Sequence, residues 1–389
     1  MKPLFIILLL PFCISCDLPR QERTPETPNP EESEFTEDVN LLAGSVFLVG
    51  FEGASPKDPG VIMAKKALLE GRAAGVVFLG RNLPVRGDKD YKKKVLELTS
   101  YLREGVSPPP IIAVDQEGGV VERLKPTDKR LPSFRSIGET EDDKKARAKA
   151  FEAGREAALQ LKELGFNLNF SPVVDLYRPK DSMPTPPDAL TKEMALKLDK
   201  RSFGENPRRT AMLGAEVIWG HLVEGVFPCA KHFPGHGITP TDTHYALPEV
   251  DIPLEFLLEY ELVPFITAIS NGAPAIMTSH IINRSLDAEL PATLSRAVLT
   301  GLLRRRLGFR GVIITDDMTM DAIRNMPGGN ARAAISALDA GADLLIFAWR
   351  PEDWPKAYEA VRFGIAVGEL SKAALIVNQR RMNSLLRRE

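Results

Sequence analysis

This chain of 389 residues has few cysteines, no excess of either charge and no long hydrophobic run. Its three cysteines, Cys13, Cys16 and Cys229, cannot build a disulfide framework or a cysteine-based zinc site. The 50 Lys and Arg residues against 52 Asp and Glu leave a formal net charge of −2, which gives no support to a nucleic-acid-binding function. Apolar residues make up 44% of the chain, so it can bury the large core of a globular protein.

The amino terminus has the pattern of an export signal. Lys2 precedes a near-continuous apolar run over residues 4–14, which is shorter than the roughly 20 residues that span a bilayer. Ser15 directly before Cys16 resembles the bacterial lipoprotein signal, in which that cysteine is lipidated after cleavage, although Cys13 stands where leucine is usual. We predict a signal segment over residues 1–16 with lipidation at Cys16. An uncleaved anchor and plain secretion are the alternatives.

The segment that follows is a predicted tether. Residues 17–39 are rich in Glu, Pro and Thr and carry too little apolar surface to order themselves. We therefore expect a protein of the bacterial cell envelope, held at a membrane by its lipid anchor, whose folded domain begins near residue 40. A monomer is expected.

From residue 40 onward, short apolar runs alternate with charged stretches of helical periodicity. The runs are apolar on both faces, as parallel strands covered by helices are, and each helical stretch ends at glycine. Eight repeats in one chain predict an α/β fold, a single TIM (β/α)8 barrel over residues 40–389. A doubly wound open sheet is the rival, but no glycine-rich dinucleotide motif follows the first run. The eight predicted strands lie within residues 44–51, 74–80, 110–116, 166–176, 225–233, 273–281, 311–317 and 341–349.

Polar residues gather at the carboxyl ends of these predicted strands, which is where the active sites of barrels lie. A single Asp in such a position is usually a helix cap, but six polar residues on different strands are harder to explain that way. They are Asp115, Asp175, Lys231, His232, His280 and Asp316.

The segment 231–244, "KHFPGHGITPTDTH", contains three of the five histidines of the chain. A histidine oriented by a carboxylate can transfer protons near neutral pH, and Asp242 stands two residues before His244 on a loop rich in Gly and Pro. A metal site built from His232, His236, Asp242 and His244 is one alternative. Histidines that only satisfy loop backbone are another.

A second chemical signal is the sequence "GVIITDDM", in which Asp316 and Asp317 end the seventh strand. A carboxylate at a strand end is rigidly aimed and can attack an anomeric carbon. Other charged and imidazole side chains could bind sugar hydroxyls. These candidate substrate-binding residues are Asp115, Arg123, Arg201, Lys231 and His232.

Together these motifs resemble glycoside hydrolase family 3, and within it the single-domain, NagZ-type bacterial β-N-acetylglucosaminidases. Eight motifs occur in the expected order. They are "VDQEGG" (114–119), "FSPVVDL" (170–176), "RSFG" (201–204), "KHFPGHG" (231–237), "DTH" (242–244), "IMTSH" (276–280), "PATLS" (291–295) and "ITDDM" (314–318).

The resemblance implies a TIM barrel that cleaves terminal β-linked N-acetylglucosamine from cell-wall fragments or related amino-sugar oligosaccharides. It makes Asp316 the nucleophile and the pair Asp242–His244 the acid/base, with the five residues above on the sugar and no metal or other cofactor. One departure is Val120, which stands where the family commonly has Arg. A family 3 β-glucosidase or phosphorylase remains open. So do a metal-dependent barrel hydrolase and a lipid-anchored sugar-binding protein without activity.

Overall fold

The computed structural model describes residues 38–124, 130–177, 198–237, 239 and 247–386. The predicted signal segment and tether, with Cys13 and Cys16, lie outside these residues, and so do Asp242 and His244. The division of the chain at residues 16 and 39 therefore stays a prediction.

Eight parallel strands close into one barrel, as the sequence predicted, and the open-sheet alternative is wrong. Each predicted apolar run contains one barrel strand. In spatial order around the barrel these are β1 (Phe47–Val49), β12 (Leu344–Phe347), β11 (Val312–Asp317), β9 (Ala275–Thr278), β7 (Phe227–Phe233), β6 (Leu168–Asn169), β3 (Ile111–Val114) and β2 (Gly75–Phe78). Every neighbouring pair is parallel.

The strands are apolar on both faces because the barrel has two cores. Successive side chains of a strand point to opposite faces. In β1, Leu48 packs inside the barrel, whereas Phe47 and Val49 pack with residues of the surrounding helices. Cys229 of β7 is buried in the interior core as a free thiol. This double burial explains the near-continuous apolar runs seen in the sequence.

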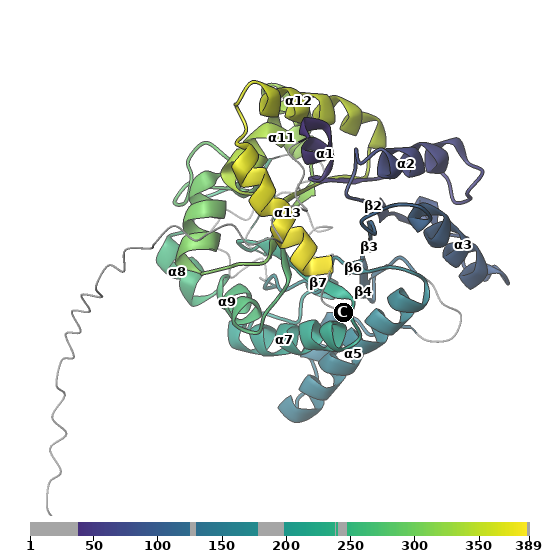
Figure 1. The fold of residues 1–389 in the computed structure, drawn as a ribbon. Helices are drawn as coiled ribbons and strands as arrows, with labels where there is room; N and C mark the ends of the chain where they lie inside the picture. The colour runs from purple at the N-terminus through teal and green to yellow at the C-terminus, as the bar shows by residue number, and fades with distance from the viewer. Residues whose placement is uncertain (1–37, 125–129, 178–197, 238, 240–246, 387–389) are drawn as a thin grey trace, which may run out of the picture. The chain divides into compact units, whose positions relative to one another are not determined.

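Helices surround the barrel (Figure 1). The α-helices are α1 (Val39–Gly44), α2 (Pro59–Leu69), α3 (Tyr91–Arg103), α4 (Phe134–Gly138), α5 (Asp143–Glu163), α7 (Pro207–Val223), α8 (Leu254–Glu259), α9 (Val263–Ser270), α10 (Asp321–Arg324), α11 (Gly329–Ala340), α12 (Trp354–Ala366) and α13 (Lys372–Leu386). The shorter 3-10 segments are η2 (Gly80–Asn82), η5 (Ala292–Leu294) and η7 (Pro351–Asp353), and η6 (Ala297–Arg306) is a π-helix.

The two longest helices within the described ranges, α5 and α7, begin and end where local chemistry directs. The side chain of Asp142 accepts the N–H of Lys145 and so caps α5. Asn206 caps α7 in the same way, and proline occupies the first position of that helix. Shortly after each helix comes a glycine with positive φ, 82° at Gly165 and 78° at Gly225, a conformation that disfavours other residues.

Two small sheets lie outside the barrel. β4 (Gln116–Gly118) and β5 (Val121–Glu122) form an antiparallel hairpin directly after β3, and β8 (Glu249–Val250) pairs with β10 (Ile282–Asn283). The first hairpin matters for function, because it carries Glu117 to the carboxyl end of the barrel.

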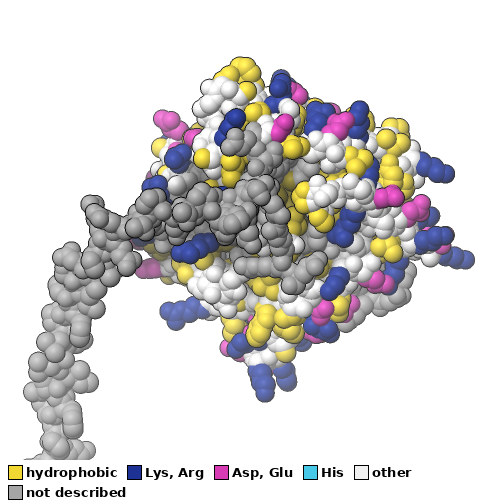
Figure 2. Space-filling view, in the orientation of Figure 1, with side chains coloured by type: hydrophobic (Ala, Val, Ile, Leu, Met, Phe, Trp, Pro, Cys, Tyr) yellow, Lys and Arg dark blue, Asp and Glu magenta, His cyan; other side chains and the backbone are white. Residues whose placement is uncertain are grey.

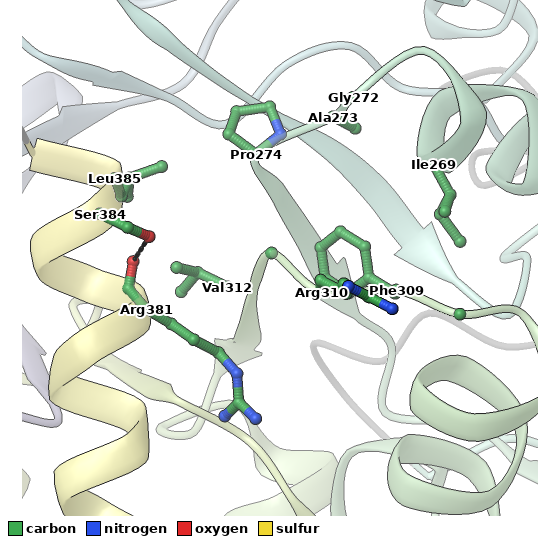
Figure 3. A pocket seen from close by; sticks show the side chains of 12 residues that line it. Ile269, Gly272, Ala273, Pro274, Phe309, Arg310, Val312, Arg381, Ser384 and Leu385 are labelled. Atoms are coloured by element: carbon green, nitrogen blue, oxygen red, sulfur yellow. Dashed lines mark hydrogen bonds between the residues drawn. The ribbon is translucent and has the colours of Figure 1, made fainter. Parts of the chain in front are cut away.

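The amino end of the barrel is closed by α13, the yellow helix across the front of Figure 1. Its residues Met382 and Leu385 join the interior core. A pocket of about 240 Å³ lies beside this helix, where Pro274 and Val312 mark the starts of β9 and β11 (Figure 3). It is at the opposite end of the strands from Asp316, so it is separate from the predicted site.

The surface agrees with the balanced composition. On the face seen in Figure 2, basic and acidic side chains are interspersed rather than gathered into a patch of one sign. Within the described ranges, no helix is both long enough and apolar enough to cross a membrane.

Candidate active site

Charged residues from three segments meet at the carboxyl end of the barrel. Lys231 of β7 is buried, and its Nζ donates to Asp115 Oδ1 at 2.6 Å and lies 2.8 Å from Glu117 Oε1. Arg201 donates two hydrogen bonds of 2.8 Å to the two oxygens of Glu117. The structure thus brings together Asp115, Arg201 and Lys231, three of the predicted sugar-binding residues. It adds a fourth charge, Glu117.

Glu117 is the centre of this cluster. Its carboxylate is buried, and burial alone would raise its pKa, but the nearby charges of Arg201 and Lys231 outweigh burial and lower the pKa of Glu117 to about 2. Burial likewise opposes the charge of Lys231, yet Asp115 and Glu117 raise the pKa of Lys231 above its usual value. Glu117 and Lys231 are therefore both charged at neutral pH.

A second arrangement orients His232. Buried Asp175, which follows β6 in the chain, accepts from His232 Nδ1 at 2.7 Å and from the backbone N–H groups of His232 and His236 at 3.1 and 2.7 Å. Burial would raise the pKa of Asp175, but His232, His236 and these hydrogen bonds lower it overall. Asp175 thus holds one ring nitrogen of His232 and fixes the direction of the other.

The two consecutive carboxylates that end β11 have different surroundings. Asp317 accepts hydrogen bonds from the backbone N–H of Thr319 (3.0 Å), Ala348 (3.3 Å) and Trp349 (2.7 Å), and from the hydroxyl of Thr319 (2.8 Å). Asp316 is half-buried, and its Oδ1 accepts the N–H of Asp317 at 2.8 Å. Asp317 is thus held by four hydrogen bonds from neighbouring segments, and Asp316 is the carboxylate that the family resemblance predicts as the nucleophile.

Asp316 and the charged cluster share one end of the barrel. The thiol of Cys229 lies in the barrel interior, and it interacts electrostatically with Lys231, Asp115 and Asp316 at once. Burial of this thiol, the largest influence, raises its pKa, so Cys229 is an inert packing residue. His236, whose pKa is lowered mainly by burial, also interacts with Asp316.

The four other predicted residues differ in outcome. Arg123 is half-buried, and its Nε makes no hydrogen bond within the part of the chain that the structure describes. His280 is buried between the hydroxyl of Thr293 (2.8 Å) and the carbonyl of Asp317 (3.0 Å), so it supports the end of β11. Asp242 and His244, the predicted acid/base pair, lie outside the described residues.

No group of three His, Cys, Asp or Glu side chains within the described ranges has the arrangement of a metal site. Of the four ligands in the metal alternative, His232 and His236 are described. The centroids of their rings lie 5.6 Å apart and the ring planes are nearly perpendicular. Nδ1 of His232 is hydrogen-bonded to Asp175.

The profile of the "Glycosyl hydrolase family 3 N terminal domain" matches residues 61–385. The chain belongs to glycosyl hydrolase family 3. Among its curated relatives is a beta-hexosaminidase of Neisseria meningitidis, 35% identical over 291 residues, which cover 74% of each chain. Another beta-hexosaminidase, from Xylella fastidiosa, is 34% identical over 282 residues, covering 72% of this chain and 77% of that protein.

Solved structures agree with this family. A family 3 beta-N-acetylglucosaminidase from Paenibacillus superposes with a TM-score of 0.79 at 32% identity, over 90% of this chain and 62% of that one. This chain thus spans less than two thirds of the Paenibacillus protein. NagZ from Neisseria gonorrhoeae, solved with N-trifluoroacetyl-D-glucosamine, gives a TM-score of 0.69 at 29% identity, with 87% and 89% of the two chains covered.

Sequence reasoning missed two residues of this family 3 site. Glu117 lies within the motif "VDQEGG" but has no predicted role, and Asp175 is predicted only as a polar residue at a strand end. The sequence contains part of the evidence for both roles, because a carboxylate in an apolar setting needs cationic or hydrogen-bonding partners. Which partners it would find depended on strands far apart in the chain.

Proposed function

We propose that this family 3 hydrolase is an exo-acting, retaining β-N-acetylhexosaminidase that removes terminal β-linked N-acetylglucosamine. The observation that carries the proposal is the position of Asp316, at the end of β11, at the same end of the barrel as the Asp115–Lys231 pair. Relatives named beta-hexosaminidase and structures titled beta-N-acetylglucosaminidase support the choice of sugar.

The charged cluster suits a neutral sugar. Asp115 and Glu117 carry two negative charges and Arg201 and Lys231 two positive ones, so the cluster has no net charge. Hydrogen bonds to charged groups are about twice as strong as those between neutral groups. Asp115 can accept from sugar hydroxyls and Lys231 can donate to them. Glu117, buried behind them, holds both cations in place.

The chemistry proceeds in two displacements. Asp316 attacks the anomeric carbon, the bond from that carbon to the leaving oxygen breaks, and His244 gives its proton to that oxygen. Water then attacks the glycosyl ester on Asp316, while His244 takes a proton from the water, and the sugar leaves with its configuration retained. General acid/base catalysis of this kind supplies roughly 10²–10⁴-fold of the rate.

In this scheme Asp242 orients His244 and stabilises its imidazolium form, as a buried carboxylate does in a serine-protease triad. Arg123, whose Nε has no partner among the described residues, is an additional donor for the substrate. We further propose that the natural substrates are cell-wall fragments with a terminal N-acetylglucosamine, reached from a lipid anchor at Cys16.

A panel of nitrophenyl glycosides tests the sugar specificity. We expect the β-N-acetylglucosaminide to be cleaved with a higher kcat/KM than the β-glucoside, and NMR of the first-formed sugar should show the β anomer. A preference for the β-glucoside would assign the chain to another activity of the family. Formation of the α anomer would exclude a glycosyl intermediate on Asp316. Phosphate in place of water as acceptor would appear as sugar 1-phosphate.

A further inference from the structure

An exposed tryptophan stands at the rim of the active-site end. Trp349 lies two residues beyond the carboxyl end of β12, the strand beside β11, and it is 63% exposed. Its backbone N–H donates to Asp317 Oδ2 at 2.7 Å, and the N–H of Asp317 donates to Asp316 at 2.8 Å. Two hydrogen bonds therefore connect the backbone of Trp349 to the proposed nucleophile.

The indole ring has a built support. The guanidinium of Arg81, in η2 after strand β2, lies over the ring with its carbon 5.7 Å from the ring centroid. Arg81 is itself held by the carbonyl of Ala348 (2.8 Å) and by the carboxylate of Glu52 (2.9 Å). A cation over an indole stabilises its orientation, so the ring is positioned in advance although most of it is open to solvent.

We propose that Trp349 is a stacking platform for the sugar unit on the leaving side of the scissile bond, an inference that rests on the proposed function. In an exo-acting enzyme the terminal sugar occupies the charged cluster, and the rest of the substrate extends from its anomeric carbon toward the rim. The C–H face of a pyranose is apolar and packs on an aromatic ring. The backbone of Trp349 is hydrogen-bonded to Asp317 at the end of β11, and Asp316 of the same strand attacks that carbon. The ring of Trp349 therefore lies where the second sugar emerges.

The occupant is a sugar unit with an apolar face. The ring of Trp349 supplies apolar area rather than charge, and Arg81, the cation over the ring, is already paired with Glu52. An anionic group on a substrate would therefore find no unpaired positive charge on Arg81. Stacking on an aromatic ring contributes about 0.5–1.5 kcal/mol, which corresponds to about a two- to tenfold change in kcat/KM.

Two substrates with the same terminal sugar test the platform. Chitobiose carries a second pyranose, whereas β-N-acetylglucosaminyl azide has a leaving group too small to stack. We expect Trp349→Ala to lower kcat/KM for chitobiose about two- to tenfold and to leave kcat/KM for the azide within twofold. Trp349→Phe should restore most of the loss. Trp219→Ala is the matched control, since Trp219 is a similarly exposed tryptophan (59%) on α7.

The possible outcomes separate this inference from the proposed function. An equal loss on both substrates would mean that Trp349 acts through Asp317, and an unchanged kcat/KM for chitobiose would mean that the ring touches no sugar; either result overturns the platform alone. A wild-type protein that cleaves neither substrate overturns the proposed function, and the platform with it.

Discussion

The side chain of Asn169, at the end of β6, holds both backbone groups of Gln116 in the neighbouring hairpin. Its Oδ1 accepts the N–H of Gln116 and its Nδ2 donates to the carbonyl, both at 2.9 Å. The same Nδ2 lies 2.9 Å from Nε2 of His221, a buried residue of α7. Since Gln116 stands between Asp115 and Glu117, this clamp positions two carboxylates of the site.

His221 makes the stability of the clamp dependent on pH. Burial is the main cause that lowers the pKa of His221 from 6.5 to about 4. Between these values the unfolded chain binds a proton that the folded protein does not, so stability falls as the pH falls through this window. The difference corresponds to about 3 kcal/mol. Urea unfolding at closely spaced pH values measures it.

The matched variant is His221→Gln, which keeps an acceptor for Asn169 but does not titrate. We expect its stability to change less than that of the wild type between pH 6.5 and 4. An identical slope in both proteins would show that His221 does not carry this dependence.

Glu117→Gln should impair substrate binding without removing the fold. The variant removes the charge that compensates Arg201 and Lys231, and hydrogen bonds between charged groups contribute about 1.5–3 kcal/mol. We expect kcat/KM to fall by about ten- to a hundredfold. Glu216→Gln, which breaks a surface pair with Arg147, is the control and should keep full activity.

Acid stability gives Glu117 a second readout. Its pKa is about 2 in the folded protein against 4.5 for the free group, so its contribution is present above pH 4.5 and is lost as the pH falls toward 2. Glu117→Gln should lack this loss. If the variant lost stability in acid as the wild type does, a group other than Glu117 would be responsible for that loss.

Substitutions of the neighbouring carboxylates Asp316 and Asp317 should have different effects, one on turnover and the other on stability. Asp316→Ala should abolish turnover of every glycoside while urea unfolding changes little, because the nucleophile serves chemistry rather than packing. Asp317→Asn leaves four donors with a weaker acceptor, so we expect a loss of stability of about 1–3 kcal/mol. Equal destabilisation by both changes would contradict this division.

His244→Ala tests the acid/base with leaving groups. A nitrophenolate departs without protonation, so glycosylation by nitrophenyl glycosides should survive far better than cleavage of a disaccharide. Release of the sugar then becomes slow. Mass spectrometry of the quenched enzyme should find a sugar on a peptide that contains Asp316, and azide should speed its release. An adduct on another peptide would reject the nucleophile assignment.

The predicted lipid anchor is tested by Cys16→Ser. We expect the variant to leave the membrane fraction or to accumulate as an uncleaved precursor, and an unchanged distribution with the same mature terminus would reject lipidation there. Removal of residues 1–37 should leave an active domain. Asp38 should be kept, because its side chain accepts the N–H groups of Asn40 and Leu41 and so caps α1.

Local pattern was enough to predict the barrel. Apolar runs and helical periodicity are properties of neighbouring residues, so all eight strands could be located from the sequence and helices expected between them. The same locality placed Asp115, Lys231 and Asp316 at strand ends, because parallel strands of a barrel finish on one side.

Only the tertiary structure decided which charges meet. Lys231 and Asp115 are 116 residues apart in the chain, and closure of the barrel brings them within 2.6 Å. Asp316 and Asp317 are adjacent carboxylates in the sequence, and no local pattern distinguishes them. Their roles differ because Ala348 and Trp349, which follow the next strand, β12, donate to Asp317. Burial and long-range pairing set the charge state and the role of each side chain, and both arise only when distant strands pack together.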